Sequence, residues 1–82
     1  MSYEVLWSHE AFTAAEGFVT DDPTGVAALF DSIDNLATGP RPAATFPWGA
    51  DLYRLRIGRY RAIYAINDTT RTVEVVHLGR SI

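Results

Sequence analysis

The segment from residue 51 to residue 66, DLYRLRIGRYRAIYAI, constrains the fold more than any other part of the sequence. It holds two runs of alternating side chains around a turn at Gly58 and Arg59. Because side chains alternate between the faces of a strand, Arg54, Arg56 and Arg61 are predicted to share one face. The other face takes the aromatic and apolar residues Tyr53, Leu55, Ile57, Tyr60, Ala62, Tyr64 and Ile66. The pattern predicts a β-hairpin with a core on one side and an arginine surface suited to phosphate groups on the other.

Two helices are predicted before this hairpin. Ser8 is a suitable N-cap for the first helix, and Asp22 followed by Pro23 marks the start of the second. Apolar residues recur at helical spacing in both segments: Phe12, Ala15, Phe18 and Val19 in the first, and Val26, Leu29, Phe30, Ile33 and Leu36 in the second. Gly39 and Pro40 are expected to end the second helix.

The remaining segments complete a predicted β-α-α-β-β-β order. Residues 3–7 and 72–78 read as strands, and residues 39–50 read as an ordered connector that Phe46 and Trp48 attach to the body. This order predicts an α+β fold, with two N-terminal helices packed on one face of a small antiparallel sheet. The first strand is expected at an edge of the sheet. With 82 residues, the chain is expected to form a single domain spanning residues 1–82.

The last strand can be assigned to the two faces by the same alternation. Val76 and Leu78 are expected in the core, which leaves Val73, Val75 and His77 on the arginine face. This assignment depends on the register, which a one-residue bulge would change.

Charge is divided unevenly along the chain. The net charge is −3 and the pI is about 5.1, which argues against a general nucleic-acid-binding protein. Residues 1–50 contain seven acidic residues and one arginine, whereas residues 51–82 contain six arginines and three acidic residues. The second half alone is therefore basic, and it is the half that carries the predicted arginine face.

Several classes of protein are excluded by what the sequence lacks. There is no cysteine, so disulfides, thiolate metal sites and cysteine nucleophiles are excluded. His9 has no second histidine at helical spacing, and we predict neither a metal nor another cofactor. The first residues do not resemble a secretion signal, and no segment approaches the ~20 apolar residues of a membrane helix. We expect a cytoplasmic protein.

The sequence LYRLRIGRYRAIY at residues 52–64, followed by VVHLGR at residues 75–80, resembles the RelE/ParE toxin superfamily. These are the small toxins of bacterial type II toxin–antitoxin pairs. The arginine spacing, the Gly-x-Tyr-Arg turn and the final Gly-Arg carry the resemblance over the last ~30 residues. The first half agrees only in its pattern of strand, helical pair and connector.

The resemblance implies a ribosome-dependent mRNA endoribonuclease that inhibits translation. RelE-type members enter the ribosomal A site and cut the mRNA there, and a cognate antitoxin covers their basic face. In RelE-type toxins, basic residues at the positions that correspond to Arg54, Arg56, Arg61 and Arg80 bind the RNA and stabilise the transition state. We therefore assign catalysis to Arg61, Arg80 and His77, and RNA binding to Arg54, Arg56 and Arg59, although an exposed turn charge is the simpler interpretation of Arg59.

Two differences from the RelE-type pattern keep alternatives open. RelE-type toxins usually continue beyond the Gly-Arg pair with basic residues and a C-terminal tyrosine, whereas this sequence ends at Ser81 and Ile82 and is acidic overall. ParE-type members share the fold but inhibit DNA gyrase. The alternatives are a ParE-like gyrase inhibitor and a weakened toxin that mainly binds its antitoxin.

The chemistry of metal-independent RNA cleavage limits the roles of these residues. A 2′-hydroxyl nucleophile needs a base, the phosphorane needs a cation, and the leaving oxygen needs an acid. Arginine supplies the cation, but its pKa above ~12 makes it a poor acid or base. His77 is the first candidate for proton transfer, followed by Tyr53, Tyr60 and Tyr64. The competing interpretations are an inert surface histidine, core tyrosines, and arginines that form a solvated strand face.

Overall fold

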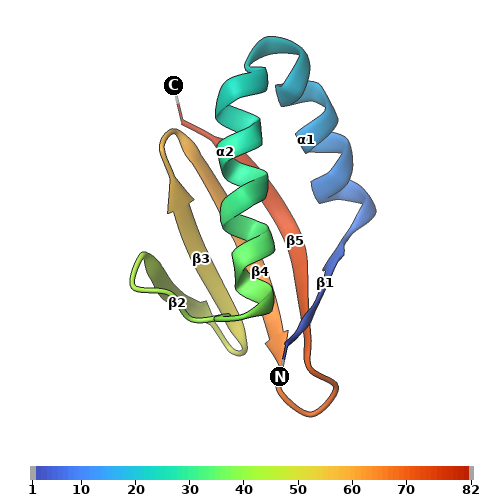
Figure 1. The fold of residues 1–82 in the computed structure, drawn as a ribbon, viewed down its shortest axis with the longest axis vertical. Helices are drawn as coiled ribbons and strands as arrows, with labels where there is room; N and C mark the ends of the chain where they lie inside the picture. The colour runs from blue at the N-terminus through green and yellow to red at the C-terminus, as the bar shows by residue number, and fades with distance from the viewer. Residues whose placement is uncertain (1, 82) are drawn as a thin grey trace.

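The computed structural model describes residues 2–81, so Met1 and Ile82, the ends of the predicted domain, lie outside the described residues. The elements over this range are, in chain order, β1 (Glu4–Trp7), α1 (His9–Asp21), α2 (Pro23–Asp34), the short 3-10 helix η1 (Asn35–Ala37), β2 (Thr45–Gly49), β3 (Leu52–Ile57), β4 (Tyr60–Asn67) and β5 (Thr72–Arg80). Both α-helices lie against one face of the sheet, and β2 lies to the side of them (Figure 1). The predicted α+β fold is confirmed.

The described strands form one sheet in the order β1-β5-β4-β3-β2. β2, β3, β4 and β5 pair with their neighbours in antiparallel fashion, whereas β1 pairs with β5 in parallel. β1 therefore occupies an edge, as predicted, but it makes the sheet mixed rather than purely antiparallel. The chain between the two parallel strands runs through both helices and through β2, β3 and β4, which provides the long connection that a parallel pairing requires.

Both predicted helix starts are confirmed by hydrogen bonds. The Ala11 backbone N–H donates to Ser8 Oγ (3.1 Å), and the Gly25 N–H donates to Asp22 Oδ1 (3.1 Å). Pro23 occupies the first turn of α2. A Cβ at residue 25 would collide with the Asp22 carboxylate, so only glycine allows this cap to close over the helix.

The core lies between the helices and the sheet. It contains the buried residues Ala11, Ala15, Val26, Leu29, Ile33, Leu36, Leu55, Tyr60, Ala62, Tyr64, Ile66, Val73, Val75 and Leu78. The β3 and β4 residues in this set are those that alternation assigns to the core. No helix within residues 2–81 is long and apolar enough to cross a membrane.

The predicted faces of β5 are wrong for Val73, Val75 and Val76, because the strand contains a bulge; Val76, expected in the core, is only half-buried and lies outside it. Ile63 pairs with His77 and Tyr64 with Val75, which leaves Val76 as an extra residue without a partner. The bulge reverses the alternation, so Val73 and Val75 are buried in the core rather than exposed among the arginines. The junction between β1 and α1 is hydrogen-bonded to this bulge. The Ser8 N–H donates to the Val75 carbonyl (2.9 Å), and the Ser8 hydroxyl donates to the Val76 carbonyl (3.2 Å).

The predicted connector contains the edge strand β2, and its aromatic residues do not attach it to the body. Phe46 and Trp48 are both exposed. Attachment comes instead from the buried Tyr64, whose hydroxyl donates to the Pro40 carbonyl and pairs with Thr45 Oγ1 (both 2.7 Å). Since Thr45 faces the helix side, Phe46 must face the other side.

Candidate functional site

The site is built on the face of the sheet opposite to the helices, called the open face below. Antiparallel pairing places Arg56 opposite Arg61, and Arg61 opposite Gly79. A second row runs from Arg54 through Ile63 to His77. The structure therefore brings together four of the six predicted site residues, Arg54, Arg56, Arg61 and His77, on three adjacent strands.

The open-face arginines have no intramolecular countercharge. Within residues 2–81, no carboxylate lies within ion-pair distance of Arg54, Arg56 or Arg61. Like charges placed directly opposite each other on neighbouring strands destabilise a sheet. Arg56 and Arg61 are such a pair, and an anion bound between them would remove the repulsion. The guanidinium groups of this surface are therefore free to bind an external anion, and the phosphate group is one that suits arginine.

The Arg61 and His77 side chains both lie over Gly79. A Cβ on Gly79 would lie 3.4 Å from Arg61 Nε, 3.5 Å from His77 Nε2 and 3.6 Å from Arg61 Nη2. The guanidinium and the imidazole therefore converge over the bare backbone of this glycine. A Cβ would make ordinary van der Waals contact with both side chains, so a residue larger than alanine would compete with them for the space.

His77 has a carboxylate partner on the first helix. His77 Nδ1 lies 3.0 Å from Glu10 Oε2, and both side chains are exposed. A carboxylate that accepts a hydrogen bond from Nδ1 leaves Nε2 as the ring nitrogen able to take up a proton. That nitrogen is the one near Arg61. The arrangement can supply a base beside a phosphate-binding cation.

Arg80 and Arg59 lie on the other side of the molecule. Arg80 donates to Asp21 (2.6 Å), and its guanidinium lies over the Phe18 ring. The pKa of Arg80 is raised, mainly by the hydrogen bond to Asp21 and to a smaller extent by the interaction with Tyr60. Arg59 lies 3.6 Å from Asp22. The structure therefore does not bring these two arginines to the open face.

The tyrosines considered for proton transfer also belong to the helix side. Tyr64 is fully buried, and burial raises the pKa of its hydroxyl. Tyr60 is buried and donates to Asp22 (2.8 Å), a bond that contributes most to lowering the pKa of Asp22. Tyr53 stacks on Tyr64 and accepts a bond from Arg41. Of the proposed acid–base residues, His77 is the one on the open face.

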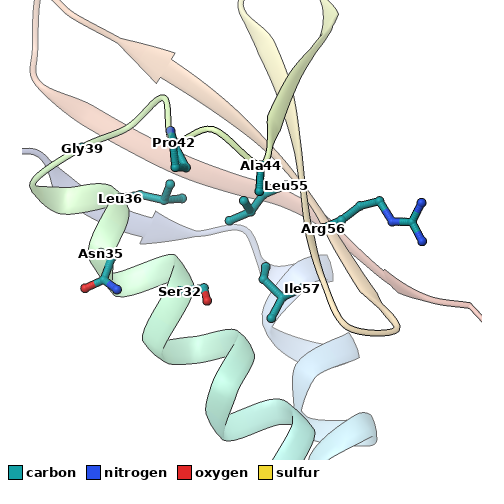
Figure 2. Close-up of a pocket in the computed structure, with 9 residues that line it drawn as sticks. All are labelled: Ser32, Asn35, Leu36, Gly39, Pro42, Ala44, Leu55, Arg56 and Ile57. Carbon is teal, nitrogen blue, oxygen red and sulfur yellow. The ribbon is translucent and has the colours of Figure 1, made fainter.

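A pocket of about 320 Å³ lies on the helix side, between the end of α2 and β3. Its lining consists of Ser32, Asn35, Leu36, Gly39, Pro42, Ala44, Leu55, Arg56 and Ile57. The Arg56 side chain points away from the pocket (Figure 2). The other lining residues carry no charge and no acid–base group, so we place the chemistry on the open face.

Sequence reasoning missed Glu10, Phe46 and Trp48 as members of the open-face surface. Glu10 lies 67 positions before His77 in the chain, and no local pattern connects the two. Phe46 and Trp48 belong to a strand that the Pro- and Gly-rich composition concealed. No cluster of three or more potential metal ligands occurs within residues 2–81.

Comparison with known proteins decides the family. The sequence model described as "ParE toxin of type II toxin-antitoxin system, parDE" matches residues 9–81. The chain belongs to this toxin family. The match confirms the resemblance to the RelE/ParE superfamily on which the sequence assignments were based. A comparison with curated proteins found no match to the chain.

Solved structures of the superfamily show the same fold. A chain of the RelBE2 toxin–antitoxin complex from Mycobacterium tuberculosis has a TM-score of 0.83 at 23% identity, with 98% of this chain and 99% of that chain covered. The isolated E. coli RelE toxin gives 0.82 at 20% identity, covering 98% and 85%. A chain of the chromosomal ParDE system from P. aeruginosa gives 0.77 at 11% identity, covering 98% and 97%. At these identities the likeness extends to the fold alone.

Proposed function

We propose that this member of the ParE toxin family cleaves mRNA on the ribosome, and that the open face is its active surface. The observation that carries the proposal is the Arg56–Arg61 pair, which places two cations opposite each other without a carboxylate partner among the described residues. A sheet tolerates such a pair best when an external anion binds it. The RNA phosphate is that anion in this proposal.

In the proposed reaction, the 2′-oxygen of a nucleotide attacks the adjacent phosphorus. Arg61 and Arg56 stabilise the negative charge that develops on the phosphorane oxygens. The bond from phosphorus to the 5′-oxygen then breaks, leaving a 2′,3′-cyclic phosphate and a 5′-hydroxyl. The leaving oxygen takes its proton from solvent water.

His77 is the proposed general base. Nε2 accepts the proton of the 2′-hydroxyl and afterwards releases it to solvent, while Glu10 holds the ring through Nδ1. The position of Nε2 near the Arg61 guanidinium supports this role, because the base and the cation must act on the same phosphodiester. Glu10 is a positioning residue in this scheme, since it acts through His77.

The partners follow from the same surface. We propose the ribosome and its mRNA as the target, which places the protein in the cytoplasm. We also propose a cognate antitoxin that neutralises the toxin by covering the open face with acidic residues, because the arginines there lack countercharges. The RelBE2 structure from M. tuberculosis is a toxin–antitoxin complex of the same fold, which supports this assignment.

Primer extension on a defined mRNA in a cell-free translation mixture tests the proposal. New 5′ ends within A-site codons are expected when the protein is present, and they should disappear when ribosomes are omitted. His77→Ala should reduce the cleavage rate by about 100-fold or more. His9→Ala is the matched control, since His9 is also exposed but belongs to the first turn of α1 and not to the sheet. Intact mRNA at high protein concentration would reject ribosome-dependent cleavage.

A second candidate is gyrase inhibition without catalysis, which the match to the ParE family favours. It predicts inhibition in a gyrase supercoiling assay together with intact mRNA. A third candidate is a weakened toxin that mainly binds its antitoxin. It predicts no growth arrest on overexpression, no cleavage and no gyrase inhibition, but tight antitoxin binding.

A further inference from the structure

Two aromatic side chains of β2 stand beside the site without a role in the reaction proposed above. Phe46 exposes 53% of its surface and Trp48 exposes 54%. Phe46 pairs with Arg54 across β2 and β3, which places it on the open face. Trp48 lies at a register shift between Pro47 and Gly49, where the extra residue can be turned toward the same face.

Arg54 holds this aromatic pair in place. Its guanidinium carbon lies 4.7 Å from the centre of the Trp48 ring and 6.0 Å from the centre of the Phe46 ring. Arg54 Nε is buried and has no hydrogen-bond partner among the described residues, so contact with the rings accounts for its position better than polar bonding does. The exposed fraction of Trp48 shows that much of its ring remains accessible to a ligand.

We propose that Trp48, supported by Arg54 and flanked by Phe46, is a stacking platform for an unpaired base of single-stranded RNA. This inference rests on the proposed function and adds a base-binding subsite to its phosphate-binding site. Arginine rows and exposed aromatic rings are the combination by which proteins bind single strands, because every base has a face that can stack. The RNA strand would run from Trp48 toward the Arg56–Arg61 pair.

The spacing on β3 fits this arrangement. Arg54 and Arg56 are two residues apart on one strand, which separates them by about 6.6 Å. This separation is comparable to that of successive phosphates in an extended nucleic-acid strand. A base on Trp48 would therefore belong to a nucleotide next to the phosphodiester held by Arg61. Bases inside a duplex have no free face, so a single strand is the ligand that fits.

The test measures binding of a short single-stranded RNA with 2′-O-methyl groups, which cannot be cleaved, by fluorescence anisotropy. Trp48→Leu should weaken binding about 5- to 150-fold, the range expected for loss of one stacked base. Trp48→Tyr should retain most of the affinity. Phe12→Leu is the matched control, because Phe12 is 49% exposed but lies on α1. Thermal melting establishes that each variant is folded.

A second arm removes the base instead of the tryptophan. An otherwise identical oligonucleotide with abasic positions should bind the unchanged protein as weakly as the intact RNA binds Trp48→Leu, and the two losses should not add. The base-binding subsite is rejected if Trp48→Leu binds RNA like the Phe12→Leu control. It is also rejected if the substitution weakens binding of poly-L-glutamate, a polyanion without bases, as much as it weakens binding of RNA.

The subsite and the proposed function can fail separately. Normal ribosome-dependent cleavage combined with RNA binding that does not depend on Trp48 rejects the subsite alone. Binding that depends on Trp48 and on the base, without any cleavage in the translation mixture, supports the subsite and rejects the cleavage proposal.

Discussion

Arginines on the two sides of the sheet have opposite surroundings. On the helix side, Arg41 pairs with Asp68 (2.9 Å), Arg59 approaches Asp22 (3.6 Å) and Arg80 pairs with Asp21 (2.6 Å). On the open face, Arg54, Arg56 and Arg61 have no such partner within residues 2–81, and two of them face each other. The side chains are identical, so the acidic residues of the helices and the β4–β5 turn make the difference.

The comparison separates arginines that hold the fold from arginines that are free to bind. A paired guanidinium has already used its donors and its charge on a carboxylate, whereas an unpaired one can offer both to a phosphate. The acidic first half of the chain therefore does not weaken the basic surface. Its residues Asp21 and Asp22 lie beside arginines of the helix side, and no carboxylate within residues 2–81 forms an ion pair with Arg54, Arg56 or Arg61.

The largest expected effect is on Arg61. Arg61→Ala should lower the rate of ribosome-dependent cleavage by about 100- to 1000-fold, because it removes a donor to the charge that develops on the phosphorane. The melting temperature should stay unchanged or rise slightly, since the side chain is exposed and its removal relieves the repulsion with Arg56. Arg41→Ala is the control from the helix side. Equal losses of cleavage in the two variants would contradict the division of the arginines.

The next largest effect concerns stability alone. Tyr64→Phe should reduce the free energy of unfolding by about 1–3 kcal/mol, because the Pro40 carbonyl and the Thr45 hydroxyl lose a buried partner. Chemical denaturation measures this change. Tyr53→Phe, which removes a more exposed hydroxyl on the same side, should cost less than about 0.5 kcal/mol. Both variants should cleave normally when folded, and a cleavage defect in either would place chemistry on the helix side.

The family resemblance and the structure predict different roles for Arg80. The resemblance assigns it to catalysis, whereas its pairing with Asp21 predicts a role in the fold. Arg80→Ala should lower the melting temperature modestly and leave the cleavage rate of the folded protein close to normal. Asp21→Asn should have the same effect on melting. If Arg80→Ala abolishes cleavage while Asp21→Asn does not, Arg80 belongs to the active surface.

The smallest effect appears only in acid. The pKa of Asp68 is lowered by hydrogen bonds from Tyr3 and then Arg41. A carboxyl with a lowered folded-state pKa stabilises the protein at pH values above its ordinary pKa of 3.8, and this contribution is lost as the pH falls below that value. Asp68→Asn should therefore lose less stability than the unchanged chain between about pH 5 and about pH 2.

Denaturant titrations at several pH values measure this difference. Asp31→Asn is the matched control, because Asp31 is exposed and its side chain has no hydrogen bond or ion pair among residues 2–81. An Asp68→Asn curve that falls in parallel with the curve of the unchanged chain would show that this carboxylate does not contribute to acid unfolding.

Local patterns were sufficient to predict most of the fold. The sequence correctly predicted the hairpin, the caps at Ser8 and Asp22, and the core residues of β3 and β4. Each of these depends on alternation or on contacts within a few residues. Predictions failed where those rules do not apply, and the faces of β5 and the structure of residues 39–50 are the clearest cases. The bulge at Val76 reversed the faces of β5, and the strand β2 was concealed by its proline and glycine content.

The sequence by itself determined the fold class, the superfamily and the arginine face of the hairpin, since period-2 alternation and the motif are encoded in neighbouring residues. Only the tertiary structure decided which arginines are paired, that Glu10 lies within hydrogen-bond distance of His77, and that Arg61 and His77 both lie over Gly79. It also decided that Trp48 and Phe46 lie beside Arg54. These arrangements join residues that are far apart in the chain or displaced by a bulge, and chain folding rather than local propensity brings such residues together.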